Sequence, residues 1–327
     1  MAVVVTGSAG FVGYHVSQAL LARGEQVVGI DNLNSYYDSG LKRARLARLE
    51  AEETFIFEAA DIADRAAMEA IARRHGDAIT GVLHLAAQAG VRYSLEAPFD
   101  YVRSNLEGHM VILELCRHEL PKLSHLVYAS SSSVYGGNTK VPFSETDRVD
   151  RPVSLYAATK RSNELVSETY SHLFGLRATG LRFFTVYGPW GRPDMAYFTF
   201  TDAIANGRPI TLYHEGLLER DFTYIDDVVD GVLAALDRPP TSDLGPPHAI
   251  YNLGNHRPVQ VRRFVRVLEE ALGREAEIRF APLPPGDVLR TFADLEASRR
   301  ELGYEPKVAI EEGLPRFVAW YRDYFGT

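Results

Sequence analysis

The chain has 327 residues, 46% of them hydrophobic, and its 35 basic and 43 acidic residues give a net charge of −8. This length is enough for a large core and predicts two lobes, while the negative charge argues against a nucleic-acid or membrane-surface partner. No stretch approaches the length of a membrane span, and the apolar run at residues 2–5 is too short for a signal peptide, so the sequence predicts a cytoplasmic protein.

Cys116 is the only cysteine of the chain, so no disulfide can form within it. It lies in an apolar helical pattern, which favours a buried thiol over a metal ligand or a nucleophile. No metal site is predicted.

The first 31 residues follow a strand, turn, helix and strand pattern. A β-branched run at residues 3–5 is followed by glycines at positions 7, 10 and 13, an apolar helical pattern and a second strand at 26–30, which leads to Asp31. This order is typical of a dinucleotide-binding site. The alternative is a set of glycines that merely turn the chain.

Each glycine of this turn has a predicted use. Gly7 permits the tight turn, Gly10 lets the backbone approach a pyrophosphate, and Gly13 allows close packing of the helix, whose first N–H groups face the phosphates. Asp31 accepts hydrogen bonds from ribose hydroxyls and repels a 2′-phosphate. The sequence therefore predicts NAD, rather than NADP, as the cofactor.

Later strands continue the alternation with helices. Apolar runs at 81–85, 125–129, 178–182 and 249–253 predict further strands of a parallel sheet covered on both faces. After Gly188, segments rich in Pro, Gly and Arg interrupt this pattern. We expect a smaller lobe there, built from separate stretches of the chain.

Tyr156 and Lys160 lie four residues apart in a predicted helix, with Ser154 as its N-cap and Gly175 at its end. At this spacing the two side chains share one helical face. A fixed cation beside a phenol favours phenolate, so the pair is suited to act as a base near neutral pH.

Active sites of open parallel sheets lie beyond the carboxyl ends of the strands. We therefore expect the residues that follow each strand to bind the cofactor. They are Gly7, Gly10, Phe11, Val12, Gly13, Asp31, Asn32, Asn34, Asp61, Ile62, Leu85, Ala86 and Ala87. The serines at 130–133 form either a polar turn or, beside the Tyr156/Lys160 pair, the source of a hydroxyl that bonds the reacting oxygen.

These motifs together resemble the extended short-chain dehydrogenase/reductase superfamily, in its nucleotide-sugar branch. The stretches that carry the resemblance are 6–13, 84–87, 131–136, 156–160 and 220–227. Within that branch, 31–38, 88–94 and 182–195 resemble the UDP-glucuronate 4-epimerases. The resemblance implies a doubly wound parallel-sheet Rossmann domain at 1–182 and 218–255, and a smaller α+β UDP-sugar-binding lobe at 183–217 and 256–327.

The resemblance also implies roles for individual residues. Tyr156 is the base that takes the proton of the sugar 4-hydroxyl, Lys160 lowers the pKa of Tyr156 and binds the nicotinamide ribose, and Ser131 is the catalytic serine. Ser132 and Ser133 stand where related 4,6-dehydratases carry Asp and Glu, which argues against dehydration.

The expected substrate-binding residues lie mainly in the second half of the chain. Arg220 and Asp287 match positions that hold UDP, and Arg290 is a further candidate. Arg192 is expected to bind the uronate carboxylate through its planar fork, with Arg92 as the alternative. For the arginines, a solvated surface position is the competing interpretation. Ser131 and Thr185 complete the expected set, with Thr185 replacing an Asn common in the wider family.

The predicted activity is NAD-dependent epimerisation of UDP-glucuronate to UDP-galacturonate through a 4-keto sugar. UDP-glucuronate decarboxylation and UDP-glucose 4-epimerisation on the same scaffold remain alternatives. A non-catalytic NAD-binding sensor is a third alternative. Such a protein would be expected to have lost the Tyr/Lys pair, which is present in this chain. The resemblance also implies a homodimer packed through the helix that carries Tyr156, with Leu165 and Val166 as candidate contacts.

Overall fold

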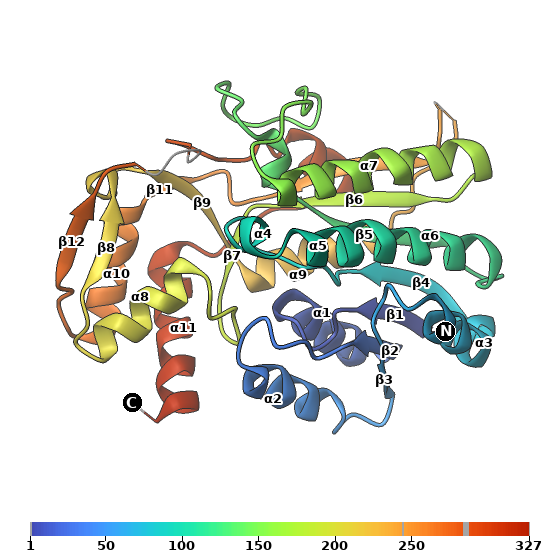
Figure 1. Ribbon diagram of the computed structural model, residues 1–327, viewed down its shortest axis with the longest axis horizontal. Coiled ribbons are helices and arrows are strands. Elements are labelled where there is room, and N and C mark those ends of the chain that lie inside the picture. Colours follow the sequence, from blue (N-terminus) through green and yellow to red (C-terminus); the bar gives the residue numbers. More distant parts are fainter. Residues whose placement is uncertain (1, 244, 284–287, 327) are drawn as a thin grey trace. The chain divides into compact units, whose positions relative to one another are not determined.

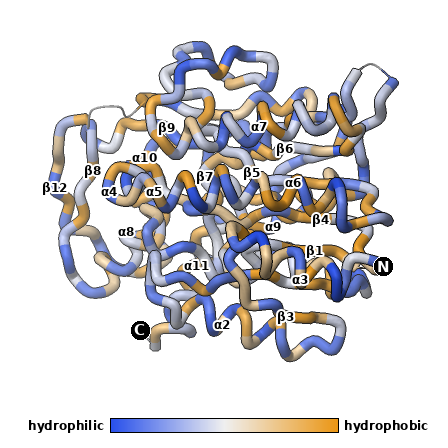
Figure 2. The backbone as a smooth tube through the Cα atoms, turned by 45° about the vertical axis from the view of Figure 1, so that its right-hand side comes forward, coloured by the Kyte–Doolittle hydropathy of each residue, from blue (hydrophilic) through white to orange (hydrophobic). Residues whose placement is uncertain are grey.

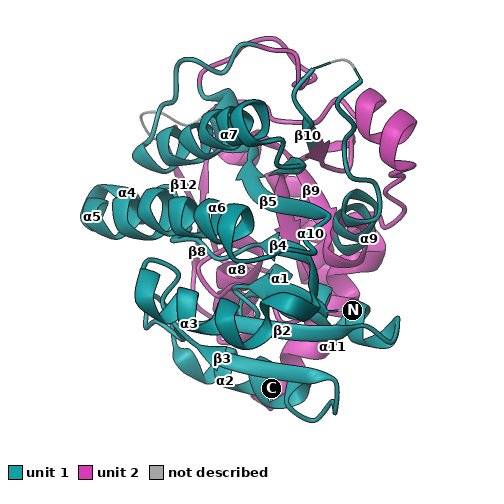
Figure 3. Ribbon diagram, turned by 90° about the vertical axis from the view of Figure 1, so that its right-hand side faces the viewer, with its two compact units in different colours: residues 1–136, 148–182, 229–251 teal, residues 137–147, 183–228, 252–327 magenta. Residues whose placement is uncertain are grey.

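A computed structural model describes residues 2–243, 245–283 and 288–326. The chain divides into two compact units, drawn in different colours in Figure 3. Unit 1 comprises residues 1–136, 148–182 and 229–251, and unit 2 comprises 137–147, 183–228 and 252–327. Like the division expected from sequence, this one cuts the chain after residue 182, but it places residues 137–147, 218–228 and 252–255 in unit 2.

Unit 1 is built on a seven-stranded sheet with strand order β10-β6-β5-β4-β1-β2-β3 (Figure 1). The strands are β1 (Ala2–Thr6), β2 (Gln26–Asp31), β3 (Phe55–Ala59), β4 (Ile79–His84), β5 (His125–Ser131), β6 (Ala178–Phe183) and β10 (His248–Leu253). The pairs β3–β2, β2–β1, β1–β4 and β4–β5 are all parallel. The strand order reverses between β1 and β4, which is where open parallel sheets bind nucleotides.

Helices cover both faces of this sheet. They are α1 (Phe11–Ala22), α2 (Ser39–Leu49), α3 (Arg65–His75), α4 (Tyr93–Glu96), α5 (Pro98–Tyr101), α6 (Gly108–His118), α7 (Leu155–Phe174) and α9 (Ile225–Leu236), with short 3₁₀ or π segments η1 (Gly76–Ala78), η2 (Val102–Glu107) and η3 (Ser132–Tyr135). One core cluster joins α3, α6 and α7 to the sheet, and Figure 2 shows the apolar character of β1 and β4. The predicted doubly wound α/β fold is confirmed.

Three side chains of these helices were singled out from sequence, Cys116 of α6 and Leu165 and Val166 of α7. Cys116 of α6 is buried and free, as predicted, and burial raises the pKa of its thiol to about 12. Leu165 and Val166 of α7, the two candidate dimer contacts, differ in their surroundings. Leu165 is 47% exposed, whereas Val166 packs against the core cluster, because consecutive helical residues point about 100° apart around the axis.

The described residues of unit 2 form two small sheets and three helices. Its elements are β7 (Thr185–Tyr187), β9 (Glu219–Tyr224) and β11 (Pro258–Gln260) in one sheet, β8 (Ile210–Tyr213) and β12 (Ile278–Ala281) in the other, helices α8 (Ala196–Ala205), α10 (Val261–Leu272) and α11 (Ile310–Phe325), and segments η4 (His214–Gly216) and η5 (Ser298–Leu302). Stacked rings of Phe222 and Phe264, with centroids 4.1 Å apart, lie in its aromatic core. The predicted smaller α+β lobe is confirmed.

None of the helices in the described ranges combines the length and apolar character needed to cross a membrane. Nor do those ranges contain a group of three His, Cys, Asp or Glu side chains that is placed to hold a metal ion.

Buried His109 and His125 and half-buried His248 are three of the unit 1 histidines that make its stability dependent on pH. Burial lowers the pKa of His109 to about 3 and those of His125 and His248 to about 4. In the unfolded chain the same imidazoles take up protons near pH 6.5. Between about pH 6.5 and 4 the unfolded state therefore binds more protons, so stability is lost as the pH falls through this window.

We expect the free energy of unfolding, measured by urea titration, to fall steadily as the pH is lowered from 6.5 to 4. His109→Asn removes one of the three groups and should reduce the slope by about 1.4 kcal/mol per pH unit. His172→Asn, at an exposed position of α7, is the control. Equal slopes for wild type and His109→Asn would contradict the assignment of His109 as a neutral buried imidazole.

Candidate active site

The turn after β1 admits only glycine at its key positions. Gly7 has a φ of +73°, and a Cβ there would lie 2.9 Å from the Ala86 nitrogen. A Cβ on Gly13 would lie 2.0 Å from the Gly7 carbonyl oxygen, and one on Gly10 would lie 2.9 Å from the same atom. Gly13 therefore serves close packing as predicted, with the turn itself as its partner.

Helix α1 begins directly after this turn, with Gly10 as an N-cap that has no capping side chain. The N–H groups of Phe11, Val12 and Gly13 are among the first of the helix, where no intrahelical acceptor exists. Such a helix start attracts anions, and the absence of a side chain at Gly10 lets a phosphate come close.

The segment after β4 lies beside the same turn. Leu85 donates its N–H to the Thr6 carbonyl (3.2 Å), and Ala86 donates to the Thr6 hydroxyl (3.1 Å). The Thr6 hydroxyl is also 2.8 Å from Nδ1 of His84. The backbone at 85–87 is thereby held against the end of β1, as expected for residues that share one cofactor site.

Asp31 ends β2 and is only 7% exposed. Its Oδ2 accepts the N–H of Ala9 (3.1 Å), and its Oδ1 accepts that of Leu33 (2.8 Å). A carboxylate has about four acceptor sites, so two backbone bonds leave capacity for ribose hydroxyls. The structure thus links the acidic residue directly to the glycine turn.

Two cations of α2 hold the loop after Asp31. Lys42 donates to Oδ1 of Asn34 (2.6 Å), and Asn34 donates its N–H to Oδ1 of Asn32 (3.1 Å). The fully buried Arg45 donates to the Tyr37 hydroxyl of this loop (2.9 Å) and to the Ala9 carbonyl of the glycine turn (3.0 Å). This support for Asn32 and Asn34 was not foreseen from sequence.

The two predicted residues after β3 are held in different ways. Asp61 accepts the N–H of Ala63 (2.9 Å) and lies 3.5 Å from Arg103. Ile62 is 6% exposed and packs against Gly108, where an added Cβ would lie 2.7 Å from the Ile62 side chain.

Helix α7 carries the predicted base. Ser154 caps it by accepting the N–H of Ala157 (3.1 Å), and Gly175 ends it in the left-handed conformation, both as predicted. Tyr156 is half-buried, with its ring edge-on to Tyr101 at 6.1 Å between centroids.

Lys160 lies one turn further along α7 and is 4% exposed. Its ammonium donates to the Ala129 carbonyl (2.9 Å) at the end of β5. Burial lowers the pKa of Lys160 to about 8, against the opposing effect of the Glu164 charge. The group is therefore mainly charged at pH 7 and has further N–H bonds to donate.

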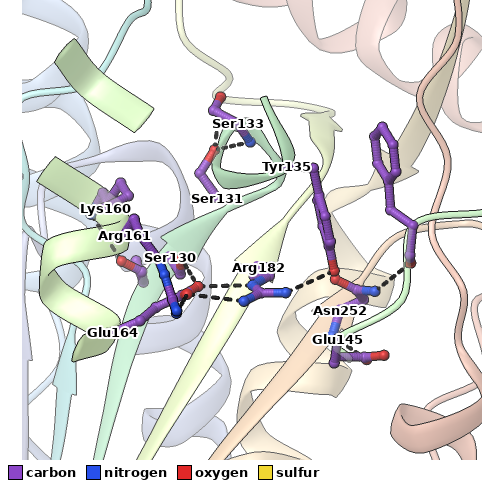
Figure 4. A network of polar contacts seen from close by, with 12 residues as sticks. Ser130, Ser131, Ser133, Tyr135, Glu145, Lys160, Arg161, Glu164, Arg182 and Asn252 are labelled. Carbon is purple, nitrogen blue, oxygen red and sulfur yellow. Dashed lines mark hydrogen bonds and ion pairs between the residues drawn. The ribbon is translucent and has the colours of Figure 1, made fainter. Parts of the chain in front are cut away.

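Ser131 is the last residue of β5 and the N-cap of η3 (Figure 4). Its hydroxyl accepts the N–H of Ser133 and donates to the Ser133 hydroxyl, both at 3.2 Å. Unit 1 therefore brings the Lys160 ammonium of α7 to the carboxyl end of β5, where it is bonded two residues before Ser131.

Asn105 is a buried polar residue that the sequence analysis missed. It lies in the π segment η2, accepts the N–H of Gln88 (2.8 Å) and donates to the Gln88 carbonyl (3.0 Å) and to the Thr159 hydroxyl (3.0 Å). It thereby ties the loop after β4 to the helix that carries Tyr156. π segments often mark functional sites, but no local sequence signal identifies this one.

The predicted arginines have different surroundings. In unit 2, Arg290 pairs with Glu219 (2.5 Å), while Arg220 donates to the carbonyl of Glu219 (2.9 Å), so the structure brings these two arginines together at the start of β9. Arg92 of unit 1 is exposed at the start of α4. Thr185 is half-buried at the start of β7, and Asp287 lies outside the described residues.

The guanidinium group of Arg192 is already paired with a carboxylate of its own loop. Its Nε and Nη2 contact the two carboxylate oxygens of Asp194 at 3.0 and 2.5 Å. Because Asp194 already occupies the bidentate position, a substrate carboxylate would have to replace it.

Two acidic residues of the motif at 220–227 stabilise the fold of unit 2. Buried Asp221 accepts the N–H groups of Asn255 (2.6 Å), Ala293 (2.9 Å) and His256 (3.1 Å). Asp227 accepts those of residues 307 and 308. These two carboxylates therefore join segments of unit 2 that are distant in the chain.

Known proteins resemble the chain over nearly its whole length. UDP-glucuronate 4-epimerase 4 of Arabidopsis thaliana is 51% identical over 334 residues, covering 99% of this chain and 76% of that protein. The UDP-glucuronic acid 4-epimerase of Bacillus cereus, solved in complex with UDP-glucuronic acid and NAD, superposes with a TM-score of 0.90 at 33% identity, covering 99% of this chain and 100% of the other. A UDP-glucose 4-epimerase of Thermotoga maritima gives a TM-score of 0.88 at 32% identity, with 99% and 100% coverage.

The family model for NAD dependent epimerases and dehydratases matches residues 3–254. This range includes the glycine turn, Asp31, Ser131, Tyr156 and Lys160. The chain belongs to the NAD dependent epimerase/dehydratase family.

Proposed function

We propose that this protein converts UDP-glucuronate to UDP-galacturonate by NAD-dependent epimerisation at carbon 4, through a 4-keto sugar. One observation carries the proposal: unit 1 contains both a glycine turn suited to a dinucleotide and, at the same sheet, the α7 helix with Tyr156 and Lys160 beside Ser131. The 51% identity to a plant UDP-glucuronate 4-epimerase supports the choice of substrate.

The residues of unit 1 fit NAD. The side-chain-free turn at Gly7, Gly10 and Gly13 and the start of α1 suit a pyrophosphate, and Asp31 suits the adenosine ribose. When bound, NAD supplies a hydride acceptor that returns the hydride within the same turnover. The remaining predicted strand-end residues line the same edge of the sheet and are proposed as further NAD contacts.

In the proposed mechanism, the phenol oxygen of Tyr156 takes the proton of the sugar 4-hydroxyl and later returns it. The Lys160 ammonium favours the phenolate, and its anchor on Ala129 fixes the position of this charge. Ser131 donates a hydrogen bond to the reacting oxygen, which stabilises the charge that develops there.

Binding of the UDP moiety is assigned to unit 2. The Arg220 and Arg290 pair beside Glu219 offers two guanidinium groups to a diphosphate, and Asp287 is proposed with them from sequence. Arg192 remains our candidate for the uronate carboxylate, with exchange of Asp194 for the substrate as part of that proposal and Arg92 as the alternative.

UDP-glucose 4-epimerisation is the second candidate, favoured by the similarity to the Thermotoga maritima enzyme. Decarboxylation of UDP-glucuronate is a third outcome, because a 4-keto uronate is a β-keto acid. Incubating the purified protein with NAD and each UDP-sugar, and separating the products by chromatography, distinguishes the three. We expect UDP-galacturonate from UDP-glucuronate. Release of UDP-pentose, or turnover of UDP-glucose alone, would refute the proposal.

Tyr156→Phe should reduce turnover by about 10²-fold or more, the usual effect of removing a positioned acid/base group. The ring and its contact with Tyr101 survive, so binding of UDP-glucuronate measured by calorimetry should stay close to wild type. Near-normal turnover of this variant would place the base elsewhere, with Ser131 the next residue to test.

Wild type should bind NAD in clear preference to NADP, and Asp31→Asn should narrow this preference about tenfold. A carboxylate and a phosphate ~4 Å apart in partly solvated surroundings repel by ~1 to 4 kcal/mol, and the amide removes that repulsion while keeping one oxygen acceptor. Calorimetry with both dinucleotides measures the effect. The control is Asp38→Asn, which alters the N-cap of α2 in the same loop. An equal loss of the preference for NAD over NADP in both variants would contradict the role of Asp31.

We also propose that the protein acts in the cytoplasm as a homodimer. Helices α4, α5 and α6 all contact α7, and this part of unit 1 exposes several large apolar side chains. They are Leu95 (78%), Phe99 (82%), Val102 (43%), Met110 (39%), Leu165 (47%) and Leu173 (61%). A second copy of the chain would cover this apolar surface.

Light scattering at micromolar concentration should give the mass of a dimer. Phe99→Asp should shift the population to monomer, since it places a charge at the most exposed apolar position of the surface. Phe280→Asp, at a 56% exposed position of β12 in unit 2, is the matched control. A monomeric wild type, or equal dissociation in both variants, would rule out this surface.

A further inference from the structure

A buried ion pair lies next to the catalytic residues of unit 1 and has no role in the mechanism above. It joins Glu164 of α7 to Arg182 of β6, whose side chains are 1% and 2% exposed. Two parallel bonds connect them, from Nε to Oε1 (2.8 Å) and from Nη2 to Oε2 (2.9 Å) (Figure 4).

We infer that Glu164 and Arg182 are positioning residues that hold Ser131 in place relative to Tyr156 and Lys160. This inference rests on the proposed function, because it concerns the rate of that reaction. The inference predicts that the ion pair affects kcat and does not affect the affinity for the substrate.

The ion pair holds the catalytic serine segment at both ends. Ser130, directly before Ser131, donates its hydroxyl to Oε1 of Glu164 (2.6 Å). Tyr135, at the end of η3, accepts a hydrogen bond from Nη1 of Arg182 (3.0 Å), and the guanidinium carbon lies 4.9 Å from the centre of the Tyr135 ring. The whole turn from 130 to 135 is therefore anchored on one rigid pair.

The same pair is part of the helix that carries the base. Tyr156, Lys160 and Glu164 follow one another at four-residue spacing, so they lie along one face of α7. Glu164 thus connects the turn of Ser131 directly to the row of Tyr156 and Lys160. Its negative charge also counteracts the effect of burial on the pKa of Lys160.

Stability alone is a poor reason for this arrangement. Moving two charges from water into the interior costs free energy that their attraction roughly offsets, and well-packed apolar residues often serve equally well. Burial by itself raises the pKa of Glu164, but the bonds and charge of Arg182 outweigh it and bring the pKa below its ordinary value. A bidentate pair does fix distance and orientation, which is what a catalytic serine requires.

Tyr135→Phe and Ser130→Ala test the inference without leaving a charge unpaired. Each removes one link between the ion pair and the turn of Ser131. We expect each to lower kcat about tenfold, while KM for UDP-glucuronate and its Kd by calorimetry change less than twofold. The control for Tyr135→Phe is Tyr128→Phe, a buried tyrosine of β5 bonded to His248 (2.8 Å). The control for Ser130→Ala is Ser298→Ala, a buried serine of unit 2 that donates to the Asn252 carbonyl (2.7 Å). Both controls should keep the wild-type kcat.

Arg182→Lys keeps the charge but loses the fork, so it should reproduce the kcat loss of Tyr135→Phe. The double variant Arg182→Lys/Tyr135→Phe should lose little more than either single variant, because both remove the same link. Glu164→Gln should move the alkaline limb of the kcat profile to lower pH, since Lys160 then releases its proton more readily. Crystal structures of Tyr135→Phe and Ser130→Ala should show Ser131 in more than one rotamer.

Wild-type kcat in Tyr135→Phe and Ser130→Ala, an equal loss in the controls, or a single unchanged rotamer of Ser131 would overturn the inference. A wild type that is inactive on UDP-glucuronate would instead refute the proposed function. In that case kcat of the same variants is measured on UDP-glucose. The rotamer of Ser131 in the crystal structures tests the inference without any activity measurement.

Discussion

The close approach of the turn after β1 to its own helix and to the segment after β4 is the constraint on which unit 1 depends. With a Cβ at Gly13 only 2.0 Å from the Gly7 carbonyl, the turn closes only if that position has no side chain. This closeness lets Asp31 bond the N–H of Ala9 and lets Thr6 bond that of Ala86. Three strand ends are thereby joined into one surface before any ligand is bound.

The end of β5 and the part of α7 beside it contain buried charges that are individually compensated. Lys160 is held by a carbonyl, Glu164 by Arg182 and Ser130, and Arg182 by Glu164 and Tyr135. An unpaired charge at this depth would cost several kcal/mol, so each group requires its partners. The result is a small network at the end of β5 that holds the Lys160 ammonium and the segment of Ser131 in place.

Unit 2 uses carboxylates for a different purpose. Asp221 and Asp227 accept backbone N–H groups from segments distant in the chain, so they replace regular sheet bonds where the strands are short. Burial raises the pKa of Asp221, and its three backbone bonds act against that effect. The Arg192–Asp194 pair shows in addition that a planar fork suited to a substrate carboxylate is already satisfied within its own loop.

The sequence by itself determined the parallel-strand pattern, the glycine turn with Asp31, and both ends of α7 at Ser154 and Gly175, because periodicity, capping and left-handed turns are local properties of the chain. Motif resemblance added the family and the trio of Ser131, Tyr156 and Lys160. Only the tertiary structure decided that Val166 faces the core, that Asn105 joins Gln88 to Thr159, and that Glu164 pairs with Arg182. These contacts join residues that lie 17 to 54 positions apart, and their partners are set by which helix packs on which strand, information that no local pattern contains.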